Sequence, residues 1–324
     1  MKLPINENGL PASRLIYGCM GLGGGWTKDP IEAKHISQAH EVVEVALDNG
    51  INMFDHADIY AFGKAETVFG QVLKENPALR EKMIIQSKLG IRFPIEDKGI
   101  PARYDFSKSY ILESVDGILS RLNIDYLDVL LLHRPDTLMD AREVGEAFNT
   151  LKASGKVRYF GVSNMSAGQI RLLQRYSTEK LVVNQLEMSL DKIGWLETGV
   201  HVNQIAARDN VFPEGTLEYC QLKNIQLQAW GSLAKGLYTG RNLEGASEKV
   251  KNTALLVQKL AEEKQVSREA IVLAWLMKHP AAIQPVIGTT NLARIKACTE
   301  AVNVTLSRDE WYSLYVSSRG VNLP

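Results

Sequence analysis

Residues 127–133 have the sequence LDVLLLH, in which an almost unbroken apolar run ends at an imidazole. Two other segments show the same pattern, since residues 51–55 end at Asp55 and the run at residues 83–87 is followed by Lys88. Continuous apolar runs are typical of parallel strands that are buried on both faces. The repeated pattern therefore predicts a parallel sheet with ionisable side chains at the ends of its strands.

Strand-like and helix-like segments alternate along the whole chain, with no linker rich in proline, glycine or serine between them. We expect eight strands, at residues 15–19, 51–55, 83–87, 127–132, 158–162, 181–183, 225–229 and 283–287. We expect helices with one apolar face at residues 33–49, 108–122, 141–154, 167–176, 217–223, 247–264, 269–278 and 292–301. Such alternation favours parallel strands joined by crossover helices. The prediction is one domain over residues 1–324, a (β/α)8 TIM barrel with an extra C-terminal helix and loops at its mouth.

The alternative fold is an open, doubly wound sheet that binds a dinucleotide at a glycine-rich turn. Residues 21–25, with the sequence GLGGG, come closest to the fingerprint GxGxxG of that fold. They do not open directly into a helix with an acid about 20 residues further on, as the fingerprint requires. We therefore favour the barrel.

Composition argues against several classes of partner. The 37 basic and 37 acidic side chains cancel, so no charge field favours nucleic acid or a membrane surface. The longest apolar runs are far below the roughly 18 residues of a membrane span, and the first residues lack the apolar stretch of a secretory signal. The three cysteines are scattered, with no CxxC pair, so we expect a reducing cytoplasm and no metal site. A monomer is the default expectation.

Four ionisable residues stand beside predicted strands, namely Asp55, Tyr60, Lys88 and His133. Neighbouring strand ends of a parallel barrel point to one mouth, so these side chains are expected to meet there. A free phenol has a pKa near 10, and a neighbouring ammonium lowers that pKa by favouring the phenolate. With Asp55 paired to Lys88, we expect Tyr60 to act as a general acid towards a carbonyl oxygen while another group delivers a hydride. His133 is expected to hydrogen-bond the same oxygen.

The chain resembles the aldo-keto reductase family over nearly its whole length. The resemblance is carried by segments in a fixed order: FDHADIY at 54–60 with Gly63 and Glu66, YLDVLLLH at 126–133, KVRYFGVSN at 156–164, Asn184-Gln185, AWGSL at 229–233, and PVIGTT at 285–290 with Arg294. It implies an oxidoreductase that reduces an aldehyde or ketone, a small-molecule carbonyl substrate, to an alcohol. The implied cofactor is NADPH/NADP+, with NADH as the alternative.

The resemblance also implies cofactor contacts. Ser163, Asn164 and Gln185 would grip the nicotinamide carboxamide, and Trp230 would stack on the ring where the family usually has a tyrosine. The pyrophosphate and adenosine phosphate would lie along Ser232, Leu233, Gly288, Thr289 and Arg294. Residues 288–290 supply no cation, so a preference for NADPH over NADH depends on the planar guanidinium of Arg294.

Two segments, residues 21–26 and 91–104, are expected to rim the mouth, and the second is a long loop. Met20, Trp26 and Phe93 are our candidates for an apolar wall of the substrate pocket. Arg134 can meet an acidic substrate, although a structural ion pair is its more ordinary role. The sequence does not name the substrate.

Two other functions compete with a reductase. Potassium-channel beta subunits resemble this family and hold NADPH while serving mainly as partners, so a sensor with little turnover is one alternative. A Schiff-base aldolase is the other, since Lys88 follows a barrel strand. A nucleophilic lysine needs a neutral amine, whereas Asp55 would keep Lys88 charged. The complete set of four residues favours the reductase.

Overall fold

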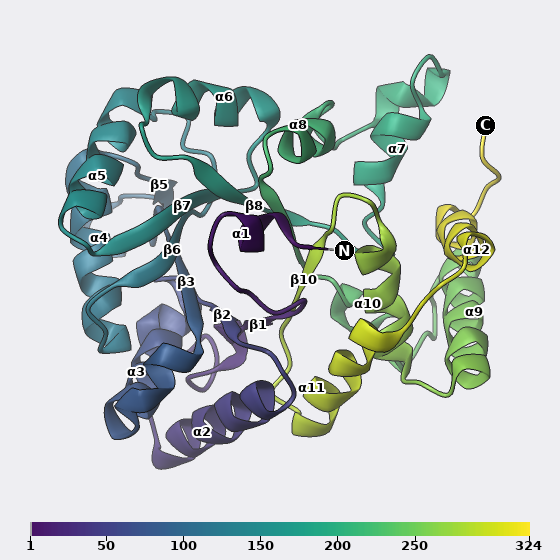
Figure 1. The fold of residues 1–324 in the computed structure, drawn as a ribbon, viewed down its shortest axis with the longest axis horizontal. Helices are drawn as coiled ribbons and strands as arrows, with labels where there is room; N and C mark the ends of the chain where they lie inside the picture. The colour runs from purple at the N-terminus through teal and green to yellow at the C-terminus, as the bar shows by residue number, and fades with distance from the viewer. Residues whose placement is uncertain (1) are drawn as a thin grey trace.

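The computed structural model of the protein describes residues 2–324, and a closed barrel of eight parallel strands lies at its centre (Figure 1). The barrel strands are β1 (Ile16–Gly18), β2 (Met53–Asp55), β3 (Ile84–Leu89), β6 (Leu127–Leu132), β7 (Val157–Ser163), β8 (Leu181–Glu187), β9 (Gln226–Trp230) and β10 (Gln284–Ile287). Their order is β1-β10-β9-β8-β7-β6-β3-β2, so each barrel strand lies beside the next one along the chain. The predicted TIM barrel is confirmed. One boundary was wrong, because Lys88 lies within β3 rather than after it.

Helices surround the barrel on all sides (Figure 1). Those that follow the strands are α2 (Ala33–Asp48), α3 (Lys64–Glu75), α4 (Lys108–Leu122), α5 (Ala141–Ala153), α6 (Ala167–Tyr176), α8 (Thr216–Leu222), α10 (Arg268–Lys278) and α11 (Leu292–Thr299). Four more are α1 (Pro4–Glu7), α7 (Gly194–Val200), α9 (Glu248–Lys264) and the C-terminal α12 (Arg308–Arg319), which packs on α9. Short 3-10 helices are η1 (Cys19–Gly21), η2 (Tyr60–Gly63), η3 (Pro77–Lys82), η4 (Glu96–Lys98), η5 (Ile205–Asp209), η6 (Ala234–Gly236) and η7 (Glu300–Asn303).

Side-chain caps mark the start of some of the predicted helices. Ser107 and Ser166 accept hydrogen bonds from the first turns of α4 and α6, and both helices match their predicted ranges. Helix α3, which was not predicted, begins after Gly63 with no side-chain cap. An N-terminus without a capping side chain gives no local start signal.

The core has an inner and an outer layer, because successive side chains of a strand point to opposite faces. Inside the barrel, Met53, Ile84 and Val129 belong to one buried cluster with Ile5 of α1. Helix α1 therefore closes the amino end of the barrel, and Figure 1 shows it over the barrel centre. The opposite end, where the strands finish, is the mouth.

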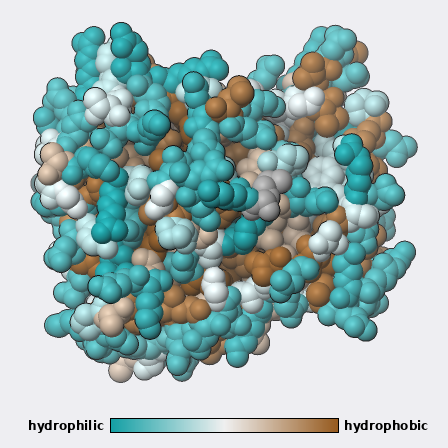
Figure 2. All heavy atoms as spheres, in the orientation of Figure 1, coloured by the Kyte–Doolittle hydropathy of each residue, from teal (hydrophilic) through white to brown (hydrophobic). Residues whose placement is uncertain are grey.

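The loops around the mouth have defined backbone structure. Ala61 and Phe62 in η2 adopt left-handed conformations, with φ of 50° and 59°. The predicted loop at 91–104 instead contains a two-stranded antiparallel sheet of β4 (Ile91–Arg92) and β5 (Arg103–Tyr104). Figure 2 shows hydrophilic residues over most of the face towards the viewer, with apolar residues in smaller groups between them. Within residues 2–324, the structure has no helix with the length and apolar character of a membrane span.

Candidate active site

A cavity of about 640 Å³ opens at the mouth of the barrel. Asp55 from the end of β2, Tyr60 from η2 and His133 from the end of β6 line it. Their strands are neighbours, since β3 pairs with both β2 and β6. These side chains therefore lie together at one mouth of the barrel, as the sequence predicted.

Lys88 lies beneath the cavity floor and joins Asp55 and Tyr60 by hydrogen bonds. Its Nζ lies 2.7 Å from Asp55 Oδ2, 3.0 Å from the Tyr60 hydroxyl oxygen and 2.8 Å from the carbonyl oxygen of His56. These three acceptors use the three N–H donors of the ammonium. The side chain of Lys88 is fully buried, so its charge is compensated entirely by the protein.

Lys88 is held in its charged form. Burial alone would lower the pKa of Lys88, but the charge of Asp55 and the hydrogen bonds to Asp55 and Tyr60 raise that pKa above its ordinary value. A charged lysine is not a nucleophile, which counts against the Schiff-base aldolase.

The pKa of Tyr60 moves in the direction opposite to our prediction. We expected Lys88 to lower the pKa of this phenol. Burial raises it above its ordinary value, and the opposing effect of Lys88 is smaller. Lys88 acts on this pKa in the direction that we expected, but the net lowering that we predicted was wrong, because the sequence does not reveal that burial outweighs the ammonium. Tyr60 therefore keeps its proton at neutral pH.

His133 faces Tyr60 with ring centroids 6.0 Å apart and planes nearly perpendicular. Burial, together with the charges of Lys88 and Arg134, holds the pKa of His133 well below its ordinary value. Among residues 2–324, no group bonds its Nδ1 atom. A neutral imidazole has one N–H donor, so His133 can offer a hydrogen bond to a ligand without introducing a charge.

Glutamine side chains fix the second oxygen of Asp55. Gln86 and Gln185 donate to Asp55 Oδ1 over 2.6 Å and 3.1 Å, and both also donate to Gln228. Gln185 was predicted to grip a nicotinamide carboxamide. Its two N–H groups are instead used within the protein, which leaves its side-chain oxygen as the atom available to a ligand.

A second buried polar cluster, which the sequence did not reveal, lies beside Lys88 and its partners. Glu66 is fully buried, accepts a 2.6 Å hydrogen bond from Ser87 and forms a 2.8 Å ion pair with Arg121. Burial, and next the charge of Glu66, raises the pKa of Asp58 to about 8. Glu66 and Asp58 both stand in or near the FDHADIY segment, but Arg121 comes from α4, and only the fold brings it to them.

The predicted cofactor residues all line the cavity: Ser163, Asn164, Gln185, Trp230, Ser232, Leu233, Gly288, Thr289 and Arg294. The indole N–H of Trp230 donates to Asn164 Oδ1 over 3.1 Å, and Asn164 donates to Ser163 Oγ over 2.8 Å. Ser163 in turn donates to the backbone oxygen of Gln185. These bonds fix the plane of the indole and the orientation of the amide beside it.

Arg294 stands at the other end of the cavity and is already engaged. Its Nε donates to Glu269 over 3.1 Å, and its Nη2 donates to the Thr239 hydroxyl over 2.8 Å. Lys235 also lines the cavity, so a second cation is present at this wall. Neither Thr239 nor Lys235 was predicted, because the sequence gives no sign that residues 235–239 face residues 288–294.

The structure separates the three candidates for the substrate pocket. Met20 and Trp26 line the cavity, but Phe93 does not. Phe93 instead packs on Phe62, with ring centroids 4.9 Å apart, and Phe62 packs on Trp26 at 5.7 Å. The β4-β5 sheet carries Phe93 to the outer rim, which a prediction from loop length does not anticipate.

Arg134 lines the cavity beside His133. Its guanidinium carbon lies 5.6 Å from the centroid of the Trp230 ring. No acidic side chain in residues 2–324 forms an ion pair with it. Our expectation that Arg134 forms a structural ion pair was therefore wrong.

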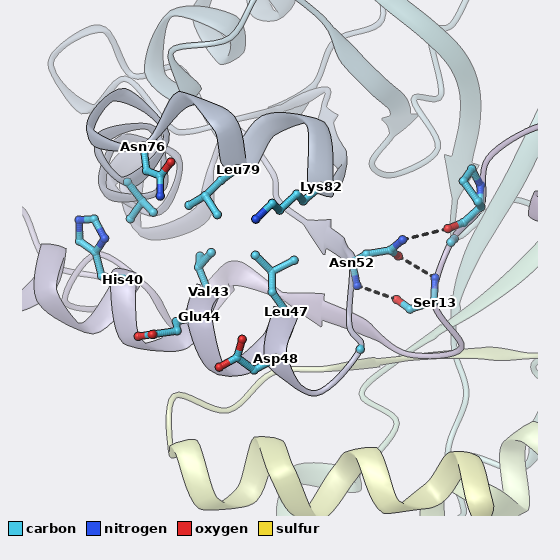
Figure 3. A pocket seen from close by; sticks show the side chains of 14 residues that line it. Ser13, His40, Val43, Glu44, Leu47, Asp48, Asn52, Asn76, Leu79 and Lys82 are labelled. Carbon is cyan, nitrogen blue, oxygen red and sulfur yellow. Dashed lines mark hydrogen bonds between the residues drawn. The ribbon is translucent and has the colours of Figure 1, made fainter.

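A second cavity, of about 790 Å³, lies at the opposite end of the barrel (Figure 3). We call it the amino-end groove; it is bordered by α2, α3 and η3 and by Ser13 and Asn52, which bond each other just before β1 and β2. His40, Glu44, Leu47 and Lys82 are among its lining residues. The part of the chain that the structure describes contains no group of three His, Cys, Asp or Glu side chains that could hold a metal ion.

Comparison with known proteins identifies the family of this chain. An oxidoreductase of uncharacterized function from Bacillus subtilis strain 168, YcsN, is 38% identical over 97% of both chains. A 6-dehydroglucose reductase from Agrobacterium fabrum is 37% identical over 96% of both. A crystal structure of an aldo/keto reductase from Klebsiella pneumoniae, in complex with NADP and acetate, shares the fold with a TM-score of 0.71 and 23% identity, over 94% of this chain and 90% of that one. Residues 14–315 match the model of the aldo/keto reductase family, and the chain belongs to that family.

Proposed function

We propose that this aldo/keto reductase is an NADPH-dependent oxidoreductase that reduces an aldehyde or ketone to an alcohol, with Tyr60 as the general acid. One observation carries the proposal. A fully buried ammonium, Lys88, lies 2.7 Å from Asp55 and 3.0 Å from the hydroxyl oxygen of Tyr60 at the floor of an open cavity. Buried, mutually bonded ionisable groups in a cleft are typical of catalytic sites.

The bound cofactor supplies the hydride, which adds to the carbonyl carbon. Tyr60 gives its proton to the carbonyl oxygen as negative charge develops there. The Lys88 ammonium, held by Asp55, stabilises the phenolate that remains until solvent restores the proton. His133 donates its N–H to the same oxygen and so orients the substrate. The raised pKa of Tyr60 suits this direction, because the phenol stays protonated until the substrate needs the proton.

The cavity wall supplies what a nicotinamide cofactor needs. Trp230, whose indole is held by its bond to Asn164, would stack on the nicotinamide ring. Arg294 and Lys235 offer cations at the other end for the phosphates. Because of these cations, we expect the enzyme to bind NADPH more tightly than NADH. Glu269 already uses part of the Arg294 guanidinium, so we expect this difference in affinity to be smaller than an unpaired arginine would produce. The NADP complex of the Klebsiella pneumoniae relative supports this choice of cofactor.

The deciding experiment compares the parent enzyme with the Tyr60→Phe variant. We expect the variant to lose carbonyl reduction while NADPH still quenches tryptophan fluorescence. Tyr104→Phe is the matched control, since Tyr104 is an exposed phenol near the mouth that does not line the cavity. A Tyr60→Phe variant that reduces carbonyls at the parental rate would contradict the mechanism. Parental turnover far slower than cofactor exchange would instead favour an NADPH-binding sensor.

A further inference from the structure

Among the arginines around the mouth, Arg134 and Arg103 of β5 lack an acidic partner within residues 2–324, and of these two only Arg134 lines the cavity. Three others have acidic partners: Arg92 with Asp105 at 2.7 Å, Arg121 with Glu66 at 2.8 Å and Arg294 with Glu269 at 3.1 Å. Arg134 has neither an ion pair nor a side-chain hydrogen bond to any residue in 2–324, although it lines the same cavity. Its one polar contact is with the face of the Trp230 ring.

The surroundings of Arg134 make the missing partner significant. The substrate end of the cavity is walled by apolar side chains, among them Met20, Trp26, Ile59 and Ile91. A guanidinium among apolar groups loses hydration, and a bound anion compensates for that loss. Its planar fork matches two oxygens of a carboxylate or of another oxoacid anion.

The position of Arg134 indicates which ligand would bring the anion. It directly follows His133, which faces Tyr60 across the cavity, and it contacts Trp230. Under the proposed function this is the end where the nicotinamide and the carbonyl meet. The phosphate-binding candidates Thr289 and Arg294 lie in the loop after β10 and at the start of α11, and Arg294 is bonded to Glu269 there.

We propose that Arg134 is a specificity residue that binds an anionic oxoacid group on the substrate, so that the preferred substrate is a carbonyl compound carrying a carboxylate or a similar anion. The inference rests on the proposed function and adds the chemical class of the substrate. The apolar wall would hold the carbon skeleton between the anion and the carbonyl.

The test uses a neutral isostere of a carboxylate. Enzyme, Arg134→Gln and Arg134→Lys are assayed with NADPH on 3- and 4-carboxybenzaldehyde and on the matching nitrobenzaldehydes. A charge-assisted hydrogen bond lost in Arg134→Gln predicts a fall of about 10- to 100-fold in kcat/KM for the better carboxy isomer. We expect the nitro compounds to change by less than about threefold, since the intrinsic reactivity of each aldehyde cancels in the ratio of variant to parent. For the carboxy substrate, kcat/KM of Arg134→Lys should lie between the values of the parent enzyme and of Arg134→Gln.

Arg92→Gln is the matched control, because Arg92 is a nearby arginine that is already paired with Asp105 and does not line the cavity. It should leave both ratios unchanged. An equal loss on carboxy and nitro substrates in Arg134→Gln would overturn the proposal and make Arg134 a positioning residue for His133. Weaker NADPH quenching in that variant would overturn it in favour of a cofactor contact.

A binding measurement separates this proposal from the proposed function. Terephthalate is titrated by calorimetry into the NADP+ complexes of the parent enzyme and of Arg134→Gln. Binding to the parent that Arg134→Gln loses supports the anion site even if neither aldehyde is reduced, an outcome that would count against the reductase alone. No binding to the parent at millimolar concentration, or equal binding to both, would overturn the anion site.

Discussion

The mouth cavity and the amino-end groove differ in a way that volume does not predict. The groove is the larger, at about 790 Å³ against about 640 Å³. At the mouth, Lys88 and Asp55 form an ion pair whose side chains are 1% and 3% exposed. At the groove, the lining residue His40 pairs with Glu75, and their side chains are 37% and 47% exposed. Charges that the protein has removed from water and bonded to one another mark a site better than the size of a hollow does.

Solvent explains the contrast between the two pairs. Water and salt screen the exposed pair at the groove, and such pairs contribute little to stability. Removing the charges of Lys88 and Asp55 from water costs free energy. Their close ion pair and the hydrogen bonds around it offset that cost. Burying the ion pair at the mouth therefore carries a desolvation cost that the exposed pair at the groove does not have.

The largest effect is expected from Lys88→Met, set against Lys82→Met in the groove. Without the ammonium, nothing stabilises the Tyr60 phenolate, so we expect kcat to fall by about 10²- to 10⁴-fold. Lys82→Met should leave kcat unchanged, because Lys82 lines only the groove. Steady-state kinetics on variants that still bind NADPH measures both. Comparable losses in the two variants would break the contrast.

Next in size is the loss of stability in Arg121→Gln. This change leaves the fully buried Glu66 without its cation, and we expect a loss of roughly 3 kcal/mol in the free energy of unfolding at about pH 8. Burial already raises the pKa of Glu66, and removing Arg121 raises it further. An acid with a raised folded pKa loses stability as the pH rises through the interval between its unfolded and folded pKa values, so the deficit should shrink towards about pH 4.

Urea unfolding at several pH values tests this prediction, with His40→Gln at the groove as the partner experiment. His40→Gln breaks an exposed pair and should change stability little. An Arg121→Gln deficit that does not vary with pH would show that Glu66 is not the group responsible.

Asp58→Asn should reveal a gain in stability that grows with pH. The folded pKa of Asp58 is about 8, far above its unfolded value, so between about pH 4 and pH 8 the unfolded chain binds fewer protons than the folded one. Stability from this group is thus present at low pH and lost as the pH rises. Relative to the parent, Asp58→Asn should become more stable by about 1 kcal/mol per pH unit across that window.

Thermal unfolding of Asp58→Asn in buffers from about pH 5 to pH 8 measures this slope. Asp48→Asn in the groove is the control, because Asp48 lies at the end of α2 on the groove surface and should give a flat difference. A flat difference for Asp58→Asn as well would mean that Asp58 is ionised in the folded protein at neutral pH.

The sequence predicted what chain order determines and missed what burial determines. Asp55, Lys88 and His133 follow or end successive barrel strands, so their meeting at the mouth follows from the order of those strands. The direction in which the Tyr60 pKa shifts does not follow from strand order, because it depends on whether burial outweighs the charge of Lys88. The same holds for Arg121, whose bond to Glu66 spans 55 positions, and for Arg134, whose lack of a partner emerges only when its neighbours are placed.

The smallest effect is expected from the double variant His40→Ala with Glu44→Ala, which removes polar side chains from the groove wall. We expect kcat/KM to stay within about twofold of the parent, the scatter typical of surface changes. The inner core explains why: Met53, Ile84 and Val129 form a buried cluster inside the barrel with Ile5 of α1, so packed side chains fill the amino end of the barrel below Tyr60. A close-packed interior can still transmit strain. A tenfold or greater change in kcat/KM with unchanged NADPH binding would therefore show that α2 and the barrel floor couple the groove to the mouth.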